Sequence, residues 1–143
     1  MKNFDKSKIF PKNKSVGRRT WGNENLITIV PKKFSLKTLF IKKGRKGGLQ
    51  YHHKKNESGY LVHGTLIIRY DLGDGKLRQR KLKKGQSFHF PPGLVHQEEA
   101  VTDCLIVEAS TPHFNDRVRV EEKYNQRANG GLPSTKKNQV KLL

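Results

Sequence analysis

The sequence predicts an all-β domain of the sandwich or barrel type, and two features of its pattern support this. Short runs of β-prone residues recur at nearly regular spacing between about Arg19 and Val120, and Gly, Asn, Asp and Pro separate them. No long segment repeats apolar residues with the 3.6-residue period of an amphipathic helix. Many short strands with turn residues between them are typical of β-sandwiches and β-barrels.

Nine segments are predicted to be strands, because each is short, rich in β-prone residues and bounded by turn formers. They are Leu26–Val30, Phe34–Ile41, Gly48–His52, Glu57–His63, Thr65–Leu72, Lys76–Leu82, Ser87–Phe90, His96–Ala100 and Cys104–Ser110. The Asp74-Gly75 pair between the fifth and sixth segments predicts a tight hairpin, since Asp-Gly accepts the positive φ that such turns need.

The length of 143 residues fits one domain with one core, which we place at residues 20–124. Residues 1–19 are polar, basic and without periodicity, so we expect an N-terminal arm that could order against a partner. Residues 125–143 contain Asn129-Gly130-Gly131 and Pro133-Ser134, and we expect a flexible basic tail there.

The formal net charge of +18 raises the possibility of nucleic-acid binding. The two terminal segments, however, carry more than half of this charge, and most aromatic residues alternate with apolar ones in predicted strands. Nucleic-acid binders usually add exposed aromatics or a recognition helix to such charge. We therefore expect a solubilising surface, and an attraction for phosphorylated or anionic sugars fits the same charge.

Cys104 is the single cysteine, so no internal disulfide can form. This favours a reducing, cytoplasmic location. No stretch approaches the roughly 20 apolar residues of a membrane span, and the basic N-terminus lacks the apolar run of a signal peptide.

Two stretches combine possible metal ligands with turn residues. In the first, Gln50 and His52 are two residues apart and Glu57 follows. Because residues two apart on an extended strand point to one face, Gln50 and His52 can point together, and so can Tyr51 and His53.

The second stretch begins at Gly85 and contains a Pro91-Pro92-Gly93 turn followed by His96. Each stretch thus supplies ligands near a turn of a β-fold. Two segments that bring ligands to one place are what a mononuclear metal site requires.

These residues resemble the two signature motifs of the cupin superfamily, whose fold is a small β-barrel of jelly-roll type. The first motif is Glu57-x6-Gly64, and the second is Gly85-x5-Pro91-x-Gly93-x2-His96. Ala100 stands where many cupins have Asn. The resemblance implies that the predicted strands form a cupin barrel.

The first motif is most similar to that of one cupin group. Many cupins have His-x-His before the glutamate, whereas this chain has Gln50-x-His52-x4-Glu57. This version resembles the cupin of type II mannose-6-phosphate isomerases, and so does the closing segment Asp116–Tyr124, although Asn125 replaces its final glycine. The resemblance covers roughly residues 21–124.

The resemblance implies a divalent transition metal held by His52, Glu57 and His96, with Gln50 as a weaker fourth ligand. Two imidazoles and a carboxylate suit Fe, Mn, Co, Ni or Zn and leave positions open for substrate or water. His53 is an alternative to His52, because only three residues separate it from Glu57.

For proton transfer, the best candidate is Glu108, an acid in an otherwise apolar strand. The alternative is that Glu108 pairs with a basic neighbour or faces solvent. Lys54 and Lys55 follow the first motif, and we expect them in a solvated turn from which they could attract a phosphate or carboxylate. His113 is expected on a surface loop near the closing segment, and the alternative is that it lines the mouth of the pocket.

The leading hypothesis is a metal-dependent isomerase acting on a sugar or sugar phosphate. Alternatives are a non-enzymatic cupin that binds a sugar or other small ligand, and an Fe(II)-dependent oxygenase, which more often has the full His-x-His. Metal-free sugar-nucleotide epimerases of this fold rank last, since they rely on a His/Tyr pair. Such cupins commonly form homodimers, and residues 26–30, with Trp21 ahead of them, could add a strand to a partner's sheet.

Overall fold

The computed structural model of the chain describes residues 1–114 and 116–127, and nearly all of its elements are strands. In chain order they are α1 Lys6–Ile9, β1 Lys14–Arg19, β2 Gly22–Val30, β3 Phe34–Ile41, β4 Gln50–His52, β5 Glu57–His63, β6 Thr65–Asp71, β7 Leu77–Lys83, β8 Ser87–Phe90, β9 Val95–Ala100, β10 Cys104–Ser110, β11 Arg117–Arg119 and the 3-10 turn η1 Glu121–Tyr124.

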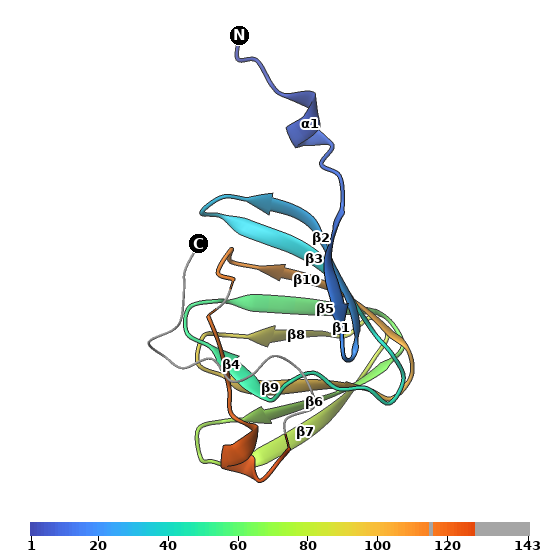
Figure 1. Ribbon diagram of the computed structural model, residues 1–143, viewed down its shortest axis with the longest axis vertical. Coiled ribbons are helices and arrows are strands. Elements are labelled where there is room, and N and C mark those ends of the chain that lie inside the picture. The colour runs from blue at the N-terminus through green and yellow to red at the C-terminus, as the bar shows by residue number, and fades with distance from the viewer. Residues whose placement is uncertain (115, 128–143) are drawn as a thin grey trace.

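The strands form two antiparallel sheets. One has six strands in the order β1-β2-β3-β10-β5-β8, and the other has five in the order β11-β4-β9-β6-β7. Figure 1 shows β2, β3, β10, β5 and β8 in succession, while the short helix α1 stands away from the strands. The predicted all-β jelly-roll domain is therefore confirmed.

The core lies between the two sheets, because alternate residues of each strand point inward. Its buried cluster consists of Leu39, Ile41, Leu61, Leu66, Ile68, Leu82, Phe90, Ala100, Cys104 and Ile106. Within β5 and β10 the same inward face also carries Glu57 and Glu108, which are both buried. The interior thus changes from apolar to charged along the strands, and the charged part forms the candidate site.

Four predicted strands, now β3, β5, β8 and β10, have the expected bounds, and the other five overlap the expected segments. The prediction missed β1 and β11. Residues 1–19, expected to be a basic arm that could order against a partner, contain α1 and β1, and β1 pairs with β2 of the same chain. Most of the expected tail, from residue 128 onward, lies outside the described residues.

The strand expected to join a partner's sheet has partners within its own chain. β2 lies between β1 and β3, so β1, and not β2, is an edge strand of this sheet. The pairing of β1 with β2 runs from Lys14 opposite Leu26 to Arg19 opposite Gly22, with an irregularity between Ser15 and Gly17.

Two turns explain the glycines of the motifs. Gly64, between β5 and β6, has φ of 95°, and a Cβ there would lie 2.2 Å from the carbonyl oxygen of Asp103. Gly93 has φ of 87° and donates its amide to the carbonyl of His52 at 2.8 Å. Only glycine tolerates such a contact at Gly64, and the Gly93 bond ties the proline turn to the strand that carries His52.

Candidate metal centre

The structure brings His52, Glu57 and His96 together from β4, β5 and β9. One ligand atom of each lies within 4.8 Å of the others, and all three residues are buried. The Nε2 atoms of His52 and His96 lie 3.6 and 3.2 Å from the same oxygen, Oε1 of Glu57. Three predicted ligands, far apart in sequence, therefore converge on one point.

Asp116 orients His52. The Nδ1 atom of His52 lies 2.8 Å from Oδ1 of Asp116, and because a carboxylate can only accept, Nδ1 is the donor. The other oxygen of Asp116 accepts the backbone amides of Lys54 and Lys55 at 2.8 and 2.7 Å. Burial would raise the pKa of Asp116, but these hydrogen bonds outweigh it and lower the pKa to about 2.

His96 is oriented by its own strand and by an aromatic ring. Its Nδ1 atom donates to the carbonyl of Leu94 at 2.9 Å, and its ring stacks on Phe90 with centroids 3.9 Å apart. Burial lowers the pKa of His52, although Asp116 and Glu57 oppose this shift. Both imidazoles therefore carry a proton on Nδ1 and turn Nε2 toward Glu57, as metal-ligating histidines do.

The geometry favours His52 over His53. The ring of His53 meets Tyr51 edge to face at a centroid distance of 5.4 Å, and its buried Nε2 has no hydrogen-bond partner among the described residues. His53 is not part of the ligand cluster. Gln50 lies on the same strand face as His52, is paired in register with His96 and lines the same cavity.

A buried lysine joins two acids beside the ligands. The Nζ atom of Lys55 lies 2.7 Å from Oε2 of Glu57 and 3.3 Å from Oε1 of Glu108. The prediction of a solvated turn is wrong for Lys55, because its side chain is only 9% exposed. Glu108 follows the alternative interpretation, in which it pairs with a basic neighbour.

These contacts set the protonation of the three groups. Burial would lower the pKa of Lys55, but the carboxylates of Glu108 and Glu57 outweigh it and raise the pKa. Burial and the charge of Glu57 raise the pKa of Glu108 to about 7. Burial would likewise raise the pKa of Glu57, but Lys55 and the two histidines bring it well below its usual range.

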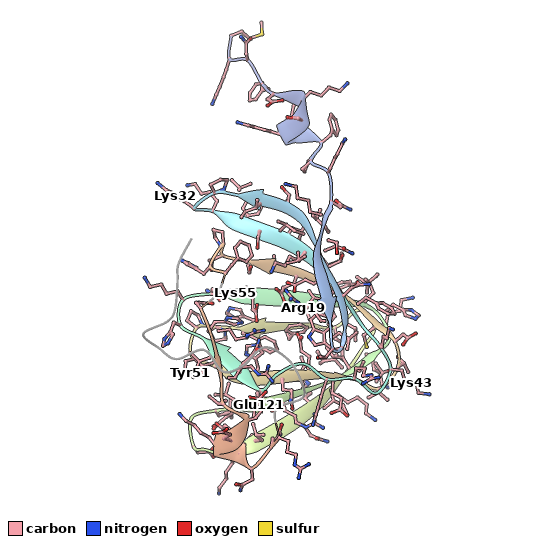
Figure 2. The ribbon with its side chains drawn as sticks, viewed as in Figure 1. Arg19, Lys32, Lys43, Tyr51, Lys55 and Glu121 are labelled. Carbon is pink, nitrogen blue, oxygen red and sulfur yellow. The ribbon has the colours of Figure 1, made fainter. Side chains whose placement is uncertain are left out.

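The cluster lies in the wall of a cavity of about 580 Å³. The cavity is also lined by residues of β1, β2 and β3, by the loop before β4, and by His113, Phe114 and Arg117. His113 thus lines the cavity as well, and its Nδ1 atom lies 2.8 Å from Oγ1 of Thr111. Figure 2 labels two of the cavity's basic side chains, Arg19 and Lys55.

Residues 38–109, half of the chain, match the family model described as "Cupin domain". The chain belongs to the cupin family. A comparison of its sequence with curated proteins finds no match.

Solved structures share the cupin's fold. The capsular polysaccharide assembling protein CapF from Staphylococcus aureus aligns with a TM-score of 0.67 at 20% identity, over 76% of this chain and 34% of that one. KdgF from Halomonas sp. aligns with a TM-score of 0.56 at 20% identity, over 66% of this chain and 81% of that one. The cupin therefore spans about a third of CapF and most of KdgF.

A third solved structure with this fold is that of a manganese protein. Bacillus subtilis oxalate decarboxylase, which has Mn(II) centres, aligns with a TM-score of 0.61 at 18% identity, over 71% of this chain and 28% of that one. No helix within the described ranges is long and apolar enough to span a membrane.

The residues of this cupin fit a divalent transition metal. Two imidazole nitrogens and one carboxylate oxygen form the donor set found in mononuclear sites with open positions. Lys55 holds only Oε2 of Glu57, which leaves Oε1 facing both histidines. The lysine is therefore compatible with a ligand that binds through one oxygen.

Sequence reasoning missed Asp116 and Glu98 as parts of the site. Glu98 follows His96 by two residues in β9 and also lines the cavity, and burial raises its pKa well above the usual value. The signal for Glu98 was present, because alternation along a strand puts residues 96 and 98 on one face. Nothing local marks Asp116, which reaches His52 across 64 residues of sequence.

Proposed function

We propose that this cupin is a metal-dependent isomerase that acts on a sugar or sugar-derived substrate. The observation that carries the proposal is the convergence of two oriented imidazoles and Oε1 of Glu57 on one point in a cavity wall. The resemblance of Gln50-x-His52-x4-Glu57 and of the closing segment to type II mannose-6-phosphate isomerases supports it.

The protein's residues would divide the chemistry between them. His52, Glu57 and His96 would hold a divalent ion, with Gln50 beside them, and that ion would act as a Lewis acid on a substrate carbonyl. Glu108 would move a proton between neighbouring carbons of the sugar, for which a carboxyl group with a pKa near 7 is suited. Lys55 would position the carboxylates of Glu57 and Glu108.

The closing segment supports this assignment because its residues make three side-chain contacts, one of which reaches a residue of the ligand cluster. Asp116 holds His52, Arg119 forms a buried ion pair with Glu121, and the hydroxyl of Tyr124 donates to Asp71 at 2.5 Å. These are positions at which the segment resembles the isomerases. The resemblance therefore concerns residues that make contacts, in addition to the ligands themselves.

The test is metal analysis of protein purified without a metal-binding tag, together with isomerase activity on a panel of sugars and sugar phosphates. We expect about one equivalent of a transition metal, and loss of both metal and activity in His96→Ala. His89→Ala is the matched control, because His89 is exposed and its Nε2 atom contacts Asn56 outside the cluster. Metal-free protein whose activity is unchanged by His96→Ala would refute the proposal.

A non-enzymatic sugar-binding cupin is the second candidate. The ion pair of Lys55 with Glu57 favours it, because the lysine already neutralises the one carboxylate of the ligand set. Binding of a sugar that survives both chelation and His52→Ala would select this function. The Fe(II)-dependent oxygenase is tested by comparing turnover with Fe(II) in the presence and absence of oxygen.

We also propose that the protein forms a homodimer. Phe4, Ile9 and Phe10 are 75%, 56% and 70% exposed, and β1 leaves one edge of its sheet unpaired among the described residues. Exposed apolar residues and unpaired strand edges are both commonly covered by a second chain. Multi-angle light scattering should give twice the monomer mass, and a monomeric mass would refute this.

A further inference from the structure

Four basic and four acidic side chains line the cavity. Its basic residues are Arg19, Lys37, Lys55 and Arg117, and its acidic residues are Glu24, Glu57, Glu98 and Glu108. With all eight groups ionised the lining is neutral, and a divalent ion at the ligand cluster would make it positive. The cavity is therefore suited to a substrate that carries negative charge.

Three of the four basic side chains are engaged by carboxylates. Arg19 and Lys37 both contact Glu24, at 3.2 and 2.7 Å, and Lys55 lies between its two acids. Arg19 contacts Glu24 through its Nε atom and also lines the cavity. The fourth basic side chain, Arg117, differs from these three in its pairing.

Arg117 is half-buried beside the ligand cluster without an ion pair to any described carboxylate. In the pairing of β11 with β4 it lies directly opposite His52, so both side chains are on the same face of the sheet. Burial and the nearby charges of Arg119 and Arg19 lower the pKa of Arg117, although the charges of Glu24 and Glu121 oppose this shift. A guanidinium drawn from water and set against like charges is costly unless an anion compensates it.

We propose that Arg117, assisted by Arg19, binds an anionic group of the substrate, a phosphate or a carboxylate, next to the metal ligands. Guanidinium groups bind both groups through paired N–H donors, and a partly desolvated setting strengthens the contact. The anion would lie between two like charges and reduce their repulsion. This deepens the proposed function and rests on it to the extent that the substrate occupies this cavity.

The position of Arg117 would make the subsite a specificity determinant. Directly opposed residues on antiparallel strands have Cβ atoms about 5 Å apart, so an anion held by Arg117 would lie within a sugar's length of the ligand cluster. A substrate could then reach both with one molecule. Neutral sugars would lack the second contact.

The probes for the test are inorganic phosphate and acetate, and the protein is treated with a chelator so that neither anion can bind a metal. Isothermal titration at low ionic strength should show saturable binding of at least one of them. Arg117→Gln should weaken that binding about 10- to 100-fold, as expected for charge-assisted hydrogen bonds, while Arg117→Lys should fall between. Stronger binding of phosphate than of acetate identifies a phosphorylated substrate, and the reverse order identifies a carboxylate.

Arg80→Gln is the matched control, because Arg80 is exposed on β7, at the opposite edge of the same sheet, and does not line this cavity. Its anion affinity should equal that of the wild type. Equal affinity in Arg117→Gln, or no saturable binding by the wild type, overturns the proposal.

A second measurement uses the wild-type protein and does not depend on how the variants fold. Phenylglyoxal modifies accessible arginines, and phosphate or acetate should protect Arg117 but not Arg80 when peptides are analysed by mass spectrometry. Lack of protection at Arg117 also counts against the proposal. Because both experiments are done without metal or turnover, their failure is distinguishable from failure of the isomerase function, which metal content and His96→Ala decide.

Discussion

The substitution Asp116→Asn tests how the protein prepares His52 for a metal. Asp116 makes three hydrogen bonds, one from the imidazole Nδ1 of His52 and two from the backbone amides of Lys54 and Lys55. An asparagine can keep only one oxygen. If that oxygen retains the two backbone amides, its NH₂ group faces Nδ1, which must then accept.

The consequence for His52 is a change of tautomer. The proton moves to Nε2, the nitrogen that faces Glu57 and would have to bind the metal. Loss of a carboxylate that orients a histidine ligand typically costs 10- to 100-fold in metal affinity, or about 1.4–2.7 kcal/mol. We expect a loss of that size in Asp116→Asn, although no ligand has been removed.

The stability effect follows from the same contacts. The pKa of Asp116 is lowered from 3.8 to about 2, so the folded state stabilises its carboxylate by about 2 kcal/mol at neutral pH. The neutral amide forfeits this, which for a chain of this size lowers Tm by about 4–8 °C.

The assay is a competition titration of Co²⁺ or Zn²⁺ against a chromophoric chelator, with thermal unfolding followed by circular dichroism. Asp103→Asn serves as the control, because the exposed Asp103 likewise accepts a backbone amide, that of Lys43, at 2.8 Å. It should change neither affinity nor Tm appreciably. Wild-type metal affinity in Asp116→Asn would show that the carboxylate does not set the tautomer of His52, and the reasoning would fail.

Three further predictions follow from the interior. A metal ion present at about 100 times its Kd should raise the free energy of unfolding by about 2.7 kcal/mol. Calorimetry should show this increase, and a chelator should reverse it. A Tm that does not change with metal would contradict a metal site. Because burial and Glu57 raise the pKa of Glu108 to about 7, its contribution to stability is present below its unfolded pKa and lost as pH rises toward 7. In urea unfolding, the free energy of unfolding of the wild type should therefore fall relative to that of Glu108→Gln between pH 4.5 and about 7. A difference that does not change with pH would argue against the shift. Gly64→Ala should lower the free energy of unfolding more than Gly73→Ala does, by about 2 kcal/mol or more. Both glycines have positive φ, but only at Gly64 would a Cβ lie 2.2 Å from a backbone oxygen. Equal decreases in the two variants would show that positive φ alone causes the loss.

The sequence was sufficient for much of the fold. Alternating β-prone residues and turn formers predicted the all-β barrel, and four of the nine predicted strands have the observed bounds. The missed strands are those with weak local signals. β1, Lys14–Arg19, is basic and contains a glycine, and β11, Arg117–Arg119, has only three residues. Both strands are stabilised by pairing, β1 with the next strand β2 and β11 with the distant β4, and neither pairing shows in the composition of the strand itself.

The candidate site, too, could be predicted only in part from the sequence. His52, Glu57 and His96 could be selected from the sequence because their spacing to turn glycines and prolines is local information. The depth of Lys55 could not, since a lysine after His53 and Lys54 has the composition of a solvated turn. Its burial depends on Glu57 and Glu108, two acids on neighbouring strands whose charges together offset the cost of removing its ammonium group from water.

By itself, therefore, the sequence determined the strands with strong patterns, the turns, and the ligand types at their spacing. Only the tertiary structure decided that Asp116 orients His52, that Lys55 is buried between two carboxylates, and that Arg117 faces the same cavity. The reason is physical. Periodicity and turn geometry act over a few residues, whereas the charge and protonation of a buried site depend on side chains that pairing and packing bring from distant strands.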